Sequence, residues 1–204
     1  MVSPYLQGMA VGGGLIVAIG AQNAFVLTQA VRRKHTLAIT LVCCLCDVFF
    51  IGLGVTGVGA AVAANPALAQ AAAWGGAVFL AWYGWGAFRS ALRGGTLEAK
   101  GEGAGSLGAT LVALLAVTLL NPHFYLDTVV LMGSISGQFA PDARTLFGAG
   151  AITASCLWFS ALSLGGRILA PVFARPLAWR VLDGLVCLVM WSLAVSLVRP
   201  QLGG

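Results

Sequence analysis

Two aspartates stand alone in long apolar stretches of this chain. Asp47 is the only formally charged residue in the 54 positions from 35 to 88, and Asp127 is the only one in the 39 positions from 103 to 141. A carboxylate in hydrocarbon is costly, so acids inside membrane-spanning segments are rare and commonly mark the path of an ion or a substrate. If these stretches cross a membrane, the two carboxylates are the first candidates for groups that bind a cation or a proton.

Asp127 belongs to a cluster of polar residues, Asn121, His123, Tyr125 and Asp127, within seven positions, and Pro122 lies among them. Pro122 has no N–H, so the carbonyl of Thr118 loses its helical partner and needs another one in lipid. His123 and Asp127 are four residues apart and share a helix face, which allows a proton relay. A hydrogen-bonded packing role explains His123 equally well.

The first apolar stretch carries a second polar pair, Gln22 and Asn23, after glycines at positions 12, 13, 14 and 20. These glycines allow a close helix approach or a local break. Amides in the middle of a span serve either as interhelical hydrogen-bonding groups or as part of a site. The similarity of Asn23 to Asn121 in the other half of the chain favours a shared site.

No basic residue lies near the centre of an apolar stretch to pair with Asp47, so this acid must be protonated, hydrated or paired with a transported cation. The pair Cys43 and Cys46 resembles a redox or metal motif, but no second pair or nearby histidine completes it. No nucleophile–base arrangement or phosphate-binding loop is present. We therefore expect no catalytic residues, no metal and no cofactor, and the five cysteines are interpreted as packing residues.

Composition indicates a membrane protein, with 59% hydrophobic residues, 8% charged residues and a mean hydropathy of +0.95. A soluble domain would carry about 25% charged residues. Because each span needs roughly 20 apolar residues, the 204 residues hold about six spans in a single transmembrane domain. The net charge of +5 is explained by basic membrane loops and does not indicate a nucleic-acid partner.

The predicted fold is all-α and polytopic. Six helices are expected, at approximately Pro4–Thr28, Leu37–Ala64, Leu68–Ser90, Leu107–Gly133, Thr145–Ile168 and Leu177–Val198. The charged, glycine-rich stretch 93–106 divides them into two three-helix repeats, residues 1–92 and 107–204. Three spans per repeat make the second repeat inverted, as in many secondary transporters. Chance similarity between glycine-rich helices is the alternative.

Basic residues predict the orientation. They concentrate in the first, third and fifth connections, and placing these in the cytoplasm puts nine basic residues inside and two outside. Both termini are then outside the cytoplasm. Arg180 and Asp183, near the cytoplasmic end of the last helix, are interpreted as an ordinary interfacial pair.

Three motifs, Gly20–Leu27, Cys46-Asp47 and Thr118–Thr128, together resemble the LysE/ArgO-type basic amino-acid exporters of bacteria. The resemblance implies export of L-lysine or L-arginine across the inner membrane, driven by ion gradients. The two motif aspartates favour this branch over sister families that export homoserine or threonine. The implied functional positions are Gln22, Asn23, Asp47, Asn121, Pro122 and Asp127.

Our leading hypothesis is a proton antiporter in which Asp47 and Asp127 alternate between the amino acid and a proton. The expected partners are a basic amino acid, protons and the lipid bilayer, with a homodimer as a further candidate. The alternatives are an exporter of neutral amino acids or of a cation, an intramembrane thiol-dependent enzyme built on residues 43–47, and a scaffold that transports nothing.

Overall fold

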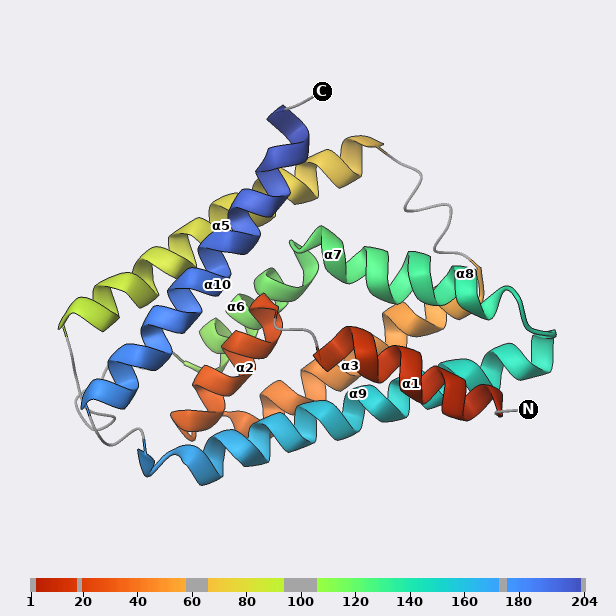
Figure 1. The fold of residues 1–204 in the computed structure, drawn as a ribbon, viewed down its shortest axis with the longest axis horizontal. Coiled ribbons are helices and arrows are strands. Elements are labelled where there is room, and N and C mark those ends of the chain that lie inside the picture. Colours follow the sequence, from red (N-terminus) through yellow and green to blue (C-terminus); the bar gives the residue numbers. More distant parts are fainter. Residues whose placement is uncertain (1–2, 18–19, 58–65, 94–105, 173–175, 203–204) are drawn as a thin grey trace.

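The computed structural model describes residues 3–17, 20–57, 66–93, 106–172 and 176–202, and within these ranges the fold contains only helices (Figure 1). In chain order the elements are α1 (Pro4–Val17), α2 (Ala21–Val31), α3 (Thr36–Val55), α5 (Pro66–Arg93), α6 (Leu107–Leu119), α7 (Pro122–Tyr125), the π-helix η1 (Leu126–Leu131), α8 (Met132–Ser136), α9 (Pro141–Leu169) and α10 (Pro176–Leu202). The predicted all-α class is confirmed. The last seven residues of the second predicted helix lie outside the described ranges.

Two of the predicted helices are broken. The first divides into α1 and α2, bent by 76°, and the fourth divides into α6 and the segment from α7 to α8, bent by 68°. The 14 residues of α1 extend only about 21 Å, which is shorter than a hydrocarbon core of about 30 Å. Helices α3 and α9 are long and apolar enough to cross singly, which gives two to four candidate spans among the described residues. Six spans in two inverted repeats remain a prediction.

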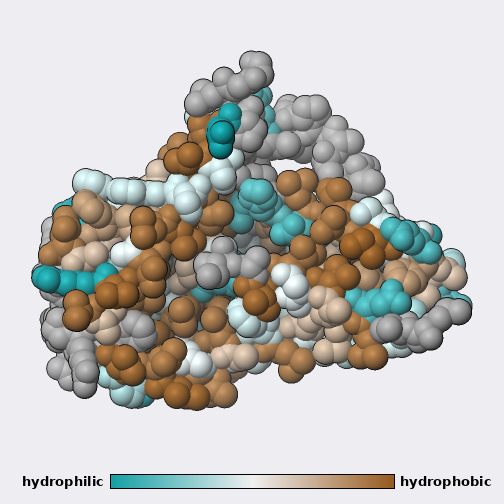
Figure 2. Space-filling view, in the orientation of Figure 1, coloured by the Kyte–Doolittle hydropathy of each residue, from teal (hydrophilic) through white to brown (hydrophobic). Residues whose placement is uncertain are grey.

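Helix α3 has two different faces, although most of its residues are apolar. Its exposed face repeats every four residues, with Leu37, Leu41, Leu45 and Phe49. Its buried face has the same spacing, with Ile39, Cys43, Asp47 and Ile51. Apolar residues also cover much of the visible surface of the molecule (Figure 2). An outward apolar face suits a lipid environment, and it leaves Asp47 pointing inward.

Helices α1 and α9 run side by side in close contact (Figure 1). A Cβ added at Gly8 would meet the backbone of Phe147, and one added at Gly12 would lie 2.8 Å from the Cα of Ala151. Small residues at these positions let the two backbones approach closely, which is the usual way that helices associate in a membrane.

Helix α3 makes an equally close approach to η1 and α8. A Cβ added at Gly54 would lie 2.5 Å from the carbonyl oxygen of Thr128 and 2.9 Å from that of Val129. In return, a Cβ at Gly133 would lie 2.8 Å from the carbonyl oxygen of Gly54. This contact holds the inward face of α3 against the segment that carries Asp127.

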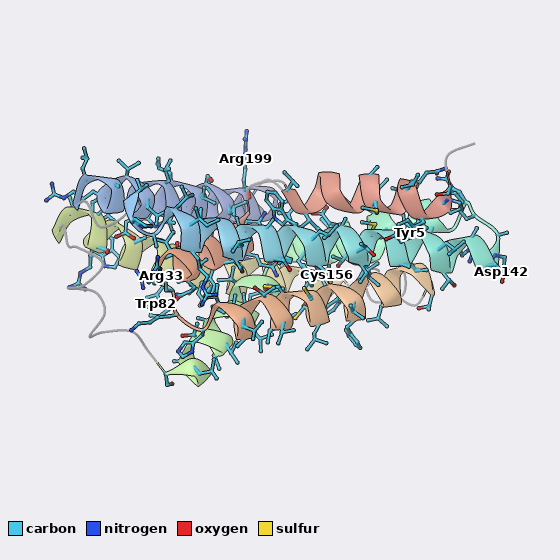
Figure 3. All side chains as sticks on the ribbon, turned by 90° about the horizontal axis from the view of Figure 1, so that it is seen from below. Tyr5, Arg33, Trp82, Asp142, Cys156 and Arg199 are labelled. Atoms are coloured by element: carbon cyan, nitrogen blue, oxygen red, sulfur yellow. The ribbon has the colours of Figure 1, made fainter. Side chains whose placement is uncertain are left out.

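Basic residues gather at one end of the molecule, which we call the basic end: Arg32, Arg33, Arg89 and Arg167. The Nη2 of Arg33 lies 3.5 Å from the carbonyl oxygen of Arg167, and Arg32 and Arg89 line one cavity. Asp142 lies at the opposite end (Figure 3). The first, third and fifth connections between the predicted helices therefore each begin or end at the basic end. The side of the membrane that the basic end faces remains a prediction.

Replacing Gly54 with alanine should destabilise the fold. The new methyl group would force α3 away from η1, and overpacking of this kind costs about 1–3 kcal/mol. The matched control is Gly52→Ala, where the added Cβ would meet nothing within 4 Å. Melting temperatures of the purified proteins in detergent should fall for Gly54→Ala and stay level or rise slightly for Gly52→Ala, because alanine is the better helix former. Equal melting temperatures would contradict the close approach.

Candidate functional site

A cavity of about 270 Å³ lies where α2, α3, α7 and η1 meet. Six of the seven predicted site residues line this central cavity: Gln22, Asn23, Asp47, Asn121, His123 and Asp127. The backbone of the seventh, Pro122, opens α7, and its side chain lies outside the described part. A cavity of this volume is large enough for several waters or for one small organic molecule. The predicted site residues therefore come from both halves of the chain and lie around one cavity.

Asp47 is buried at the wall of the central cavity, with 2% of its surface exposed. Its carboxylate accepts a hydrogen bond from the hydroxyl of Ser155 on α9, and among the described residues it makes no ion pair. An ionised carboxylate offers about four acceptor sites, so one hydroxyl leaves most of them open. The arrangement can therefore accept a cation or a proton from the cavity. Sequence reasoning missed Ser155, because a lone serine in an apolar helix gives no signal.

Asp127 lies in the π-helical turn η1 and is half-buried. His123 lies close enough to interact electrostatically with its carboxylate, as the four-residue spacing predicts. π-helical turns are rare and are often found at functional sites. The second carboxylate is therefore more accessible than Asp47, and it has a titratable neighbour.

Asn23 joins the two parts of the first broken helix. Its Nδ2 donates to the carbonyl of Ile16 in the last turn of α1 over 2.7 Å, and its Oδ1 accepts a hydrogen bond from the indole N–H of Trp158 on α9 over 3.3 Å. A carbonyl at a helix end needs such a partner in an apolar interior. Asn23 is therefore both a packing residue and a cavity residue.

Different hydrogen bonds satisfy the backbone groups at the second break, between α6 and α7. The Oδ1 of Asn121 accepts from the N–H of His123 over 3.1 Å, and the hydroxyl of Tyr125 donates to the carbonyl of Leu119 over 2.8 Å. The carbonyl of Thr118 has lost its helical donor as predicted, but it accepts from the N–H of Asn121 over 3.4 Å. The break at Pro122 is thus satisfied within the chain.

The N-terminus of α2 has no side-chain cap. Gly20 precedes it in an extended conformation, and the first residues of α2 line the central cavity. The Nε2 of Gln22 is buried there without a hydrogen-bond partner, next to the weakly accepting thiol of Cys43. A helix N-terminus without a side-chain cap, its dipole and a buried amide without a hydrogen-bond partner together make a site for an anionic group. Asn23 lies inside α2 and Asn121 precedes α7, so the two asparagines occupy different positions.

The cysteine cluster of α3 faces a cysteine of α9. Cys44 on α3 and Cys156 on α9 place their thiols against each other, and no disulfide joins the described cysteines. Among the described residues, no group of three or more His, Cys, Asp or Glu side chains gathers to hold a metal ion.

The interpretation of Asp183 as an interfacial residue is wrong. Asp183 is 2% exposed and accepts a hydrogen bond from the hydroxyl of Ser90 on α5. The residue is buried because α10 packs along α5 on the face that carries it. A contact across 93 positions could not be recognised from local spacing.

Comparisons with known proteins agree with the motif resemblance. The family model of the LysE type translocators matches residues 14–201. The arginine exporter protein ArgO of Yersinia enterocolitica is 44% identical over 99% of both chains, that of Serratia proteamaculans is 43% identical over 97% of both, and that of Photorhabdus laumondii is 41% identical over 99% of this chain and 98% of its own. No solved structure matches the chain.

Removing the Asn23 amide should weaken the first break. In Asn23→Ala the carbonyl of Ile16 loses its donor in an apolar interior, which costs about 1–3 kcal/mol. Tyr125→Phe should act in the same direction, since it removes the donor to Leu119. The control is Gln138→Ala, which deletes an exposed amide. Melting temperatures in detergent should fall for the first two variants only, and an unchanged value for both would contradict these hydrogen bonds.

Proposed function

Because this chain belongs to the LysE type translocator family, we propose that it exports basic L-amino acids, arginine foremost, across the inner membrane of a bacterium. It is a multi-pass membrane protein of a transporter family, and its relatives named above are arginine exporters. One observation carries the proposal. Two carboxylates and an uncapped helix N-terminus line the same small cavity.

The charges of the central cavity complement those of a basic amino acid. Arginine and lysine each carry two cationic groups and one carboxylate. Asp47 and Asp127 offer one carboxylate for each cation, while the N-terminus of α2 and the Nε2 of Gln22 offer donors for the anion. Among the described residues, no Lys or Arg lines this cavity, so the cargo supplies the positive charge.

Neutral amino acids fit this pattern less well. Threonine or homoserine has a single cationic group and would leave one of the two carboxylates without a partner. An inorganic cation would leave the donors at α2 unused. The three classes are separated by measuring which of lysine, threonine, homoserine and sodium displaces labelled arginine from the purified protein.

Coupling to protons follows from the same carboxylates. Moving one positive charge outward against an inside-negative potential costs about 2.3 kcal/mol per 100 mV. A carboxylate that binds either the cargo cation or a proton, but never both, makes outward transport of one depend on inward transport of the other. His123 beside Asp127 provides a group that passes the proton to water.

The proposed architecture is six spans in two inverted repeats, residues 1–92 and 107–204, with the basic end in the cytoplasm and both termini outside. The pairing of helices supports it. Helix α3 of the first repeat packs on its counterpart α9, and α5 packs on its counterpart α10. The first helix of each repeat is the one that breaks. Half-helix ends at the centre of the membrane are the usual substrate-binding elements of such repeats.

Neutralising either cavity carboxylate should slow export. Proteoliposomes loaded with labelled arginine and placed in acidic buffer should lose their label at least about thirtyfold more slowly with Asp47→Asn, because removing one partner of a buried charge pair costs about 2–5 kcal/mol. Asp127→Asn should act in the same direction but less, because Asp127 is half-buried. Asp142→Asn, exposed at the start of α9, is the control and should export normally. Unchanged export by both cavity variants would exclude the proposed site.

Exchange of one proton, shared by the two carboxylates, for one cargo of net charge +1 predicts an electroneutral cycle. In the same liposomes, acid outside should accelerate arginine efflux, while a potential set by potassium and valinomycin at equal pH should change it little. Acidification of the lumen during efflux is the direct readout. Efflux that follows the imposed potential and ignores the pH gradient would contradict proton antiport.

A further inference from the structure

A second polar cavity, of about 620 Å³, lies at the basic end between α2, α5 and α10. Its polar lining includes Thr28, Arg32, Tyr83, Arg89, Ser90 and Asp183. These residues lie outside the three sequence motifs Gly20–Leu27, Cys46-Asp47 and Thr118–Thr128. The central site described above uses none of them.

The cavity contains charges of both signs. Asp183 is 2% exposed and is held by the hydroxyl of Ser90, while Arg32 and Arg89 lie on walls formed by other helices. The ring of Tyr83 lies within electrostatic range of both Arg32 and Asp183. A zwitterion matches such a lining, with its carboxylate toward the guanidinium groups and its ammonium toward the aspartate.

The second cavity is separate from the central one but is aligned with it. Helix α2 forms a wall of both: Gln22 lines the central cavity and Arg32 the second, ten residues or about 15 Å further along. Between these two levels, the fully buried ring of Phe25 lies 5.7 Å from the ring of Tyr83. Along α2, this aromatic contact therefore lies at a level between the residues that line the two cavities.

We propose that this cavity is a second binding site for the transported amino acid, where a zwitterion is held at the basic end before it passes the Phe25–Tyr83 contact. The inference rests on the proposed export function for the identity of the ligand. The chemistry it requires is a free α-carboxylate together with an α-ammonium group.

The reactivity of a cysteine introduced at position 86 would show whether a ligand occupies the second cavity. Gly86 lines the second cavity, and a Cβ added there meets nothing within 4 Å. The full-length chain, with its five native cysteines replaced and Gly86→Cys introduced, is reacted in detergent with a small maleimide. Saturating L-arginine should slow the reaction about tenfold, whereas agmatine, which lacks the carboxylate, should not. Gly165→Cys on α9, which is also free of contacts within 4 Å and outside this cavity, is the labelling control.

Two substitutions distinguish the sites. Protection of Gly86→Cys by arginine should persist in Asp47→Asn and disappear in Asp183→Asn. Ser90→Ala, a milder change that removes the hydrogen bond to Asp183, should weaken protection and guards against misfolding of the aspartate variant. Loss of protection with Asp47→Asn alone, or no protection in any variant, would overturn the second site.

Export measured with the same preparations separates this inference from the proposed function. Protection at Gly86 without any arginine export would leave the second site standing and reject the exporter. Export that depends on Asp47, with labelling of Gly86→Cys indifferent to arginine, would reject the second site and leave the exporter standing. A second measurement, equilibrium binding of labelled arginine without cysteine replacement, should give two sites in the unaltered protein and one in either aspartate variant.

Discussion

Helix ends inside an apolar body must find hydrogen-bond partners in the protein, because no bulk water is there to supply them. This constraint shapes the centre of the structure. Asn23 satisfies the end of α1, Tyr125 the end of α6, and Asn121 the start of α7. The start of α2, after Gly20, is the one of these four ends without a side-chain partner. An end without a side-chain cap can accept a ligand without first displacing such a cap.

Much of this centre could be predicted from the sequence, because its signals are local. A proline in an apolar helix predicts the break at Pro122, and a charge with no basic neighbour marks Asp47. The contacts that hold these groups were not predictable, since Ser155 lies 108 positions from Asp47 and Ser90 lies 93 from Asp183. Such pairs depend on which helix packs on which, and apolar helices with glycines on several faces leave that choice open.

The similarity between Asn23 and Asn121 predicts only part of their arrangement in the structure. They line one cavity as expected, yet they satisfy different backbone groups. The packing around the two breaks is also unequal. Helix α2 packs on α9 to about the same extent as η1 and α8 together pack on α3. In contrast, α1 lies closely along α9, whereas α6 barely contacts α3. For the proposed inverted repeats, unequal packing is the expected appearance of any single state, because exchanging the two packings exchanges the side that is open.

The two buried aspartates show how similar contacts can serve different tasks. Asp47 and Asp183 are equally buried, and each accepts a hydrogen bond from a serine on the neighbouring helix. They differ in their surroundings: Arg32 and Arg89 line the cavity of Asp183, whereas no Lys or Arg among the described residues lines that of Asp47. For the proposed exporter, this difference means that the cargo supplies the missing positive charge at the central cavity, which favours tight and selective binding. At the proposed second site that charge is built in, so an amino acid would compete with the protein's own groups and would be released easily, as passage requires.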